Sequence, residues 1–135
     1  MKIEIWTDGS CIGNPGPMGI GVVMKFDGEL RTMSEGLGPG TNNRAEILAV
    51  IHALRHLPCP LEEADVTLYT DSALIWGWLA QGWKVKANRE LVGEMKVLAA
   101  SCRSFNVQKV QGHAGVEYNE LADELAQQGA RSNQG

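Results

Sequence analysis

Residues 7–19 read TDGSCIGNPGPMG, a run in which one carboxylate is followed by small residues, turn formers and an amide. The preceding IEIW is typical of a buried strand, so Asp8 is expected to end that strand at the edge of a sheet. A carboxylate at such an edge can hold a metal ion, and glycines let another molecule approach the backbone closely. An ordinary tight turn after a strand would use the same residues, so this stretch alone leaves both interpretations open.

The composition predicts one globular domain over residues 1–135, with 131–135 as a loose tail. The chain has 135 residues, of which 44% are hydrophobic, enough to bury a sizeable core. No stretch approaches the ~20 apolar residues that span a bilayer, and the first residues lack the apolar run of a signal peptide. We therefore expect a soluble, cytoplasmic protein with no membrane partner.

Cysteine usage and charge exclude some classes of function. The three cysteines have no metal-ligand spacing and are odd in number, which favours neither a zinc site nor a disulfide framework. The net charge of −4 and the pI of about 5.3 argue mildly against a protein that binds phosphate backbones by bulk electrostatics. Any nucleic-acid function must be compatible with this charge.

Outward from the opening stretch, the pattern predicts an antiparallel meander of three strands from Ile3 to Leu37. Asp27-Gly28 lies between two apolar-rich runs and is a strong hairpin signal. Apolar residues then repeat at helical spacing over 41–57, with Thr41 or Asn42 as the N-cap and Pro58 as the stop.

The remainder alternates between strands and helices. The expected elements are a strand at 64–70, helices at 72–82 and 89–103, a strand at 105–110 and a helix at 117–131. Ser72 is placed to cap the helix that it begins. Strands followed by this alternation predict an α/β protein, a mixed sheet with helices packed on its faces.

Four acids are expected to meet at one edge of this sheet. Asp8 ends the first strand, and Asp71 follows the strand that is reached through the first helix. If these two strands are parallel neighbours, their carboxyl ends share one crevice and bring the two carboxylates together. Glu46 is expected in the first turn of its helix, where the helix dipole favours a carboxylate, and Asp123 lies in the last helix. Clustered acids raise each other's pKa unless a cation neutralises them, and oxygen ligands suit Mg²⁺ or Mn²⁺.

Four sequence blocks resemble the signature motifs of the type 1 ribonuclease H family. They are TDGSCIGNPGP at 7–17, TNNRAE at 41–46, TDS at 70–72 and GHAGVEYNELADELA at 112–126. The resemblance implies the ribonuclease-H-like fold, with a five-stranded sheet in the order 3-2-1-4-5 and helices on both faces. It also implies an endoribonuclease that hydrolyses the RNA strand of RNA/DNA hybrids with two Mg²⁺ ions, or Mn²⁺ as a substitute, leaving 5′-phosphate and 3′-hydroxyl ends.

The resemblance assigns roles to individual residues. The catalytic, metal-binding carboxylates would be Asp8, Glu46, Asp71 and Asp123. His113 matches a catalytic histidine that assists proton transfer or product release, although a loop histidine without a role is the alternative. The substrate-binding residues implied for the hybrid groove, which must sense the 2′-hydroxyl of RNA, are Gly9, Cys11, Gly13, Asn14, Thr41, Asn42 and Asn43.

The chain departs from the family pattern between TDS and the third helix. Many members carry an additional helix with a basic cluster there, whereas this chain has the short stretch WGWLAQGWKVKANREL at 76–91. After Trp83, the cations Lys84, Lys86 and Arg89 are expected to form a reduced substitute, with Trp83, Lys84 and Lys86 binding substrate. This predicts fewer phosphate contacts and a shallower salt dependence. Tryptophans such as Trp76, Trp78 and Trp83 more often belong to the core than to a base-stacking surface, and Asn14 and Asn42 are compatible with turn or cap positions.

Two other classes share some of these features. A binding module on the same fold would need the groove residues but not all four acids. A transposase, integrase or resolvase would share the acids but would not be expected to share the NPGP, TNNRAE and GHAG blocks. Nothing in the sequence demands an obligate protein partner, and we expect a monomer. His52 and His56 lie in a helix without recognisable metal-ligand partners and receive no function from the sequence.

Overall fold

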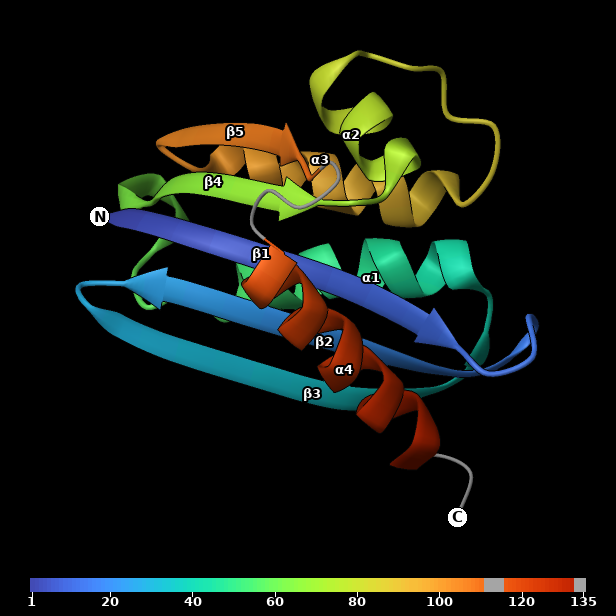
Figure 1. Ribbon diagram of the computed structural model, residues 1–135. Helices are drawn as coiled ribbons and strands as arrows, with labels where there is room; N and C mark the ends of the chain where they lie inside the picture. Colours follow the sequence, from blue (N-terminus) through green and yellow to red (C-terminus); the bar gives the residue numbers. More distant parts are fainter. Residues whose placement is uncertain (111–115, 133–135) are drawn as a thin grey trace.

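The computed structural model describes residues 1–110 and 116–132, which form a five-stranded sheet ordered β3-β2-β1-β4-β5 (Figure 1). Its strands are β1 (Lys2–Cys11), β2 (Gly16–Phe26), β3 (Glu29–Gly40), β4 (Asp65–Thr70) and β5 (Ser104–Lys109). The helices are α1 (Asn42–Arg55), α2 (Ala73–Ala80), α3 (Arg89–Ser101) and α4 (Val116–Ser132), with a short 3₁₀ helix η1 (Leu61–Glu63). The β1/β2 and β2/β3 pairs are antiparallel, and the β1/β4 and β4/β5 pairs are parallel. The predicted mixed sheet and its order are confirmed.

The predicted hairpin joins β2 to β3. Phe26 pairs with Glu29, and the two residues between them both have positive φ, 48° at Asp27 and 74° at Gly28. This backbone is that of a type I′ turn, which matches the twist of the flanking strands and suits an Asp-Gly dipeptide. The local sequence therefore fixes the register of the outer half of the sheet.

Helices cover both faces of the sheet, as expected. Ile3 and Ile5 of β1 are buried against α1 and its neighbours, whereas Trp6 packs with Ala122 of α4. Figure 1 shows α4 crossing one face while α1 and α3 lie behind the sheet. A Cβ atom on Gly21 would lie 2.1 Å from the carbonyl oxygen of Ala122, so α4 rests directly on the backbone of β2. This close approach brings the Asp123 segment toward β1.

The helix caps follow the sequence at their N-termini. Thr41 Oγ1 accepts a hydrogen bond from the Arg44 N–H at 3.3 Å, and Ser72 Oγ accepts one from the Ile75 N–H at 3.3 Å. Both bonds satisfy an N–H that the first turn of a helix leaves without a partner. At the other end of the chain, α4 continues through Arg131 and Ser132, so the segment expected to be a tail begins as helix. Residues 133–135 lie outside the described part.

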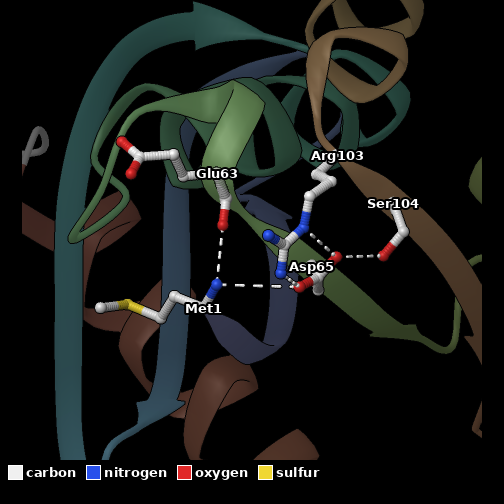
Figure 2. A network of polar contacts seen from close by, with 5 residues as sticks. All are labelled: Met1, Glu63, Asp65, Arg103 and Ser104. Atoms are coloured by element: carbon white, nitrogen blue, oxygen red, sulfur yellow. Dashed lines mark hydrogen bonds and ion pairs between the residues drawn. The ribbon is translucent and has the colours of Figure 1, made fainter.

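A polar network holds the N-terminal ends of three strands together at the end of the sheet opposite Asp8 (Figure 2). The Met1 amino group donates to the Glu63 carbonyl at 2.7 Å and lies 3.7 Å from the Asp65 carboxylate. Asp65 also accepts hydrogen bonds from the Arg103 guanidinium and from Ser104 Oγ. The Arg103 hydrogen bond is the largest cause that holds the pKa of Asp65 well below its usual range. The network ties β1, β4 and β5 in register.

The connection between α2 and α3 spans residues 81–88 and contains no helix. It begins with Gly82 at φ 64° and ends with Asn88 at φ 55°, two left-handed positions that turn the chain sharply. The prediction that this connection carries no additional helix is therefore confirmed. No helix among residues 1–110 and 116–132 has both the length and the apolar character needed to cross a membrane.

Candidate active site

The site lies where the parallel pairing of β1 with β4 ends. The last pair of that ladder is Trp6 with Tyr69, so Asp8, within β1, and Asp71, directly after β4, each lie two residues beyond it. The prediction that Asp8 ends its strand is wrong. β1 continues to Cys11 because residues 8–11 keep pairing with β2, where Asp8 faces Gly21. The residues before and after Asp8 are both extended strand, which fixes the direction of the Asp8 side chain.

Glu46 reaches Asp8 because α1 packs unusually close to β1. A Cβ atom on Gly9 would lie 2.3 Å from the Ala45 carbonyl carbon, so only glycine permits this approach. The Gly9 N–H donates to a Glu46 carboxylate oxygen and, at 3.0 Å, to Asp8 Oδ1. Glu46 is the fifth residue of α1. The prediction that it lies in the first turn of this helix is therefore wrong. The Gly9 N–H supplies the favourable contact that the helix dipole was predicted to give.

Three carboxylates meet at this point. Oxygen atoms of Asp8, Glu46 and Asp71 all lie within 4.8 Å of one another, with Asp8 buried, Glu46 half-buried and Asp71 exposed. Burial and, next, the hydrogen bond to Glu46 raise the pKa of Asp8 to about 10. Burial also raises the pKa of Glu46, but its hydrogen bonds with Asp8 and the Gly9 N–H oppose that effect. Without a cation, the pair therefore retains a proton on Asp8, as crowded acids do.

Asp123 is an exposed residue beside this group. Its carboxylate lies within hydrogen-bonding reach of Asp8 and accepts a hydrogen bond from Gln127 Nε2 at 3.1 Å. It is not part of the set of three whose oxygens all lie within 4.8 Å. The structure thus brings all four predicted acids to one edge of the sheet, three of them tightly and Asp123 at the side. His113 lies outside the described residues.

Two polar side chains that the sequence did not single out for the site contact these acids. Asn119 Nδ2 donates to Asp71 Oδ2 at 3.5 Å, while Asn119 Oδ1 is buried without a hydrogen-bond partner among the described residues. Ser72, expected only as a cap, also hydrogen-bonds to Glu46. Asn119 precedes Asp123 by one helical turn, and this spacing was the available signal because residues four apart share a helix face.

Several of the predicted groove residues hold the local backbone. Asn14 Oδ1 accepts from the N–H of Asn42 at 3.1 Å, which joins the loop after β1 to the start of α1. Cys11 Sγ donates to the carbonyls of Gly16 and Gly40, each at 3.3 Å. The structural use expected as the alternative for Asn14 is therefore real. The space at Gly9 is filled by α1, and Gly13, at φ 67°, turns the loop.

A hollow of about 490 Å³ lies next to the groove, beside the connection between α2 and α3. It is lined by Asn43, Leu74, Trp78, Trp83, Lys84, Lys86, Ala87 and Asn88. Trp78 is 7% exposed and belongs to the core, whereas Trp83 is 43% exposed and stands edge-on to Trp76 at 5.9 Å. The core role considered for these tryptophans therefore holds for Trp78, whereas Trp83 keeps an exposed ring.

Comparisons with known proteins agree with this geometry. The family model described as RNase H matches residues 1–131. A ribonuclease H of Yersinia pestis (strain Pestoides F) is 42% identical over 144 residues, covering 97% of this chain and 91% of the relative. LC11-RNase H1, isolated from compost by a metagenomic approach, superposes with a TM-score of 0.85 at 32% identity and 99% coverage of both chains. A structure of LC11-RNase H1 in complex with an RNA/DNA hybrid superposes with a TM-score of 0.80 at 28% identity, covering 98% of this chain and 99% of that one.

Proposed function

The chain belongs to the ribonuclease H family, and on that premise we propose that it is an endonuclease that hydrolyses the RNA strand of RNA/DNA hybrids. The observation that carries the proposal is the convergence of Asp8, Glu46 and Asp71 within 4.8 Å at an open sheet edge. The similarity to LC11-RNase H1, which has been seen with a hybrid, supports the same substrate class. A binding module would not need three carboxylates whose repulsion must be neutralised.

The donor set fits a divalent cation. Asp8, Glu46 and Asp71 supply only oxygen ligands, and burial together with repulsion from Glu46 and Asp71 raises the pKa of Asp8. Hard cations prefer oxygen donors, so we assign Mg²⁺ to these residues, with Mn²⁺ as a substitute and Asp123 as a further ligand. When two such ions are bound, they stabilise charge on both oxygens of the phosphodiester displacement, which leaves 5′-phosphate and 3′-hydroxyl ends.

The groove residues would position the hybrid. Cys11 ends β1, and Asn14 lies in the loop after it and joins this loop to α1 through Asn42. We assign Gly9, Gly13 and the side-chain amides of Asn14 and Asn42 to the RNA strand of the hybrid, whose 2′-hydroxyl distinguishes its sugar from that of DNA. Thr41 is the N-cap of α1, and Asn43, in its first turn, lines the hollow. Helix N-termini of this kind favour phosphate groups.

Cations near the hollow would bind the DNA strand. Lys84 and Lys86 line the hollow together with the exposed ring of Trp83, which offers a stacking surface. This local basic strip makes a net charge of −4 compatible with nucleic-acid binding. We assign proton transfer or product release to His113 from its motif alone. All these residues come from one chain, so a monomer is sufficient for the proposed activity.

The test is cleavage of three end-labelled duplexes of one sequence: an RNA/DNA hybrid, duplex RNA and duplex DNA. Each is incubated with Mg²⁺, with Mn²⁺ or with a chelator. The expected result is metal-dependent cutting of only the RNA strand of the hybrid, with 5′-phosphate on the downstream fragment. Equal cutting of duplex DNA would favour the wider group of metal-dependent nucleases, and binding without cutting under either metal would favour a binding module.

A further inference from the structure

The histidines near the C-terminal end of α1 form a pair that the proposed nuclease activity does not use. His52 lies in the last turn of α1 and His56 is its C-cap, and the contact between their rings places both side chains on one side of the chain. Their rings stack with centroids 4.2 Å apart and an interplanar angle of 29°. His56 is exposed and His52 is half-buried, so both rings are accessible at the surface.

One ring is held with a defined nitrogen free. His56 Nδ1 lies 2.7 Å from the carbonyl oxygen of His52, and since a carbonyl only accepts, Nδ1 must carry the hydrogen. Neutral His56 then has its lone pair on Nε2. Metal-bound histidines commonly use their second nitrogen in this way, donating to a backbone carbonyl that fixes the ring.

Burial favours the uncharged imidazole of His52. Burial, and next the neighbouring His56, lower the pKa of His52, so its ring is neutral at physiological pH. Glu35 of β3 opposes that shift and adds negative charge beside His52, whereas the Arg31 guanidinium contacts the His56 carbonyl at 3.4 Å. Arg55, between the two histidines in sequence, is paired with Glu94. The pair therefore has one charge of each sign beside it, Glu35 and Arg31.

From this geometry we propose that His52 and His56 form a two-imidazole site for a borderline transition-metal cation such as Ni²⁺, Cu²⁺ or Zn²⁺. Two imidazoles across a helix end suit these ions once the His52 ring turns out of the stack, so that one of its nitrogens faces the same cation as His56 Nε2. Cu²⁺ should bind most tightly of the three. The described residues add no third histidine, cysteine or carboxylate close enough to complete a group of three. Water fills the other coordination positions, and the affinity is correspondingly modest.

The site is separate from the carboxylates and prefers different ions. His52 follows Glu46 by six residues, which is about 9 Å along the helix axis. Mg²⁺ prefers oxygen ligands and would not compete for the imidazoles. A metal that bridges consecutive turns would stabilise the end of α1, because a ligand that binds only the folded state raises its stability.

The test is calorimetric titration of the untagged full chain with Ni²⁺, in a weakly coordinating buffer that contains enough Mg²⁺ to saturate the carboxylates. The wild type is expected to bind one Ni²⁺, and H52Q and H56Q are each expected to bind at least tenfold more weakly. H113Q is the matched control, because His113 is the only other histidine in the chain, and it should bind within twofold of wild type. Thermal melts should show a Ni²⁺-dependent rise in Tm for wild type and H113Q only.

The exposed position of His56 keeps the test decisive if H52Q is unstable. A circular dichroism spectrum of metal-free H56Q establishes its fold independently of metal and of nuclease activity. Wild-type Ni²⁺ affinity in folded H56Q would overturn the proposal, as would loss of binding in H113Q. Hybrid cleavage plays no part in the readout, so this site can fail while the proposed nuclease stands, and the reverse.

Discussion

The N–H of Gly9 donates a hydrogen bond to the carboxylate of Glu46, which joins β1 to α1 beside Asp8. We expect G9A to break this relationship, since its Cβ would lie 2.3 Å from the Ala45 carbonyl carbon and would push α1 away. Overpacking of this kind costs about 1–3 kcal/mol, and the nuclease activity should fall by more than the loss of folded protein explains. Denaturant unfolding and hybrid cleavage measure the two effects.

The control for that substitution is G93A. Gly93 lies inside α3, and a Cβ there would meet nothing within 4 Å. Replacing an interior helix glycine by alanine should stabilise the protein by roughly 0.5–1 kcal/mol, because alanine loses less backbone entropy on folding. If G9A and G93A changed stability alike, the close contact between β1 and α1 would not be what constrains residue 9.

Gly77 holds the ring of Trp83 in place. The backbone N–H of Trp83 donates to the Gly77 carbonyl at 3.0 Å. A Cβ atom on Gly77 would lie 1.9 Å from the Trp83 ring. We expect G77A to displace the ring from the hollow and to weaken hybrid binding several-fold. Fluorescence anisotropy with a labelled hybrid in a chelator measures this without cleavage, and unchanged affinity in a variant whose tryptophan emission has shifted would remove Trp83 from the binding surface.

Lys84 and Lys86 should set part of the salt dependence of binding. Each lysine that contacts a phosphate contributes about 0.9 to the slope of log affinity against log salt concentration, so K84A and K86A should each reduce that slope by roughly one. K2A is the comparison variant, because Lys2 lies at the start of β1, at the end of the sheet opposite Asp8. An unchanged slope in K84A and K86A would mean that neither lysine contacts the DNA backbone.

Asp65 should make stability depend on acid pH. The pKa of Asp65 in the folded protein is lowered from the ordinary 3.8, chiefly by the Arg103 hydrogen bond. Its contribution to stability is therefore complete above the unfolded-state pKa and is lost as pH falls toward the folded-state pKa. D65N should therefore melt at a lower temperature than wild type at pH 7, and the gap should shrink below about pH 4. E62Q, at an exposed acid of the adjacent η1, serves as control. A gap that stays constant into acid would assign the effect to something other than charge.

Local patterns predicted much of this fold because their causes are local. The Asp27-Gly28 turn and the caps at Thr41 and Ser72 each depend on a few neighbouring residues, and the structure confirms all three. The order of the strands came instead from the resemblance of four motifs taken together, since pairing between distant strands leaves no local mark on the sequence.

The incorrect predictions share a physical reason. Residues 9–11 look like a turn, but pairing with β2 keeps them in a strand, and only the tertiary structure provides that partner. Glu46 was placed one residue too early in its helix, so the helix dipole was credited with a contact that the Gly9 N–H makes. Asn119 escaped notice because its bond to Asp71 joins segments 48 residues apart.

The most direct measurement is the rate of RNA-strand cleavage in one hybrid against Mg²⁺ concentration, for wild type and D71N. Asp71 is exposed, so D71N should fold normally. A circular dichroism melt of D71N that matches the melt of wild type would verify this. The site geometry predicts a wild-type rate that is zero in chelator and rises with Mg²⁺, and a D71N rate at least 1,000-fold lower at every concentration, a barrier increase of about 4 kcal/mol. Cleavage by folded D71N within tenfold of wild type, with the same Mg²⁺ dependence, would contradict the assignment of these carboxylates to the metal site.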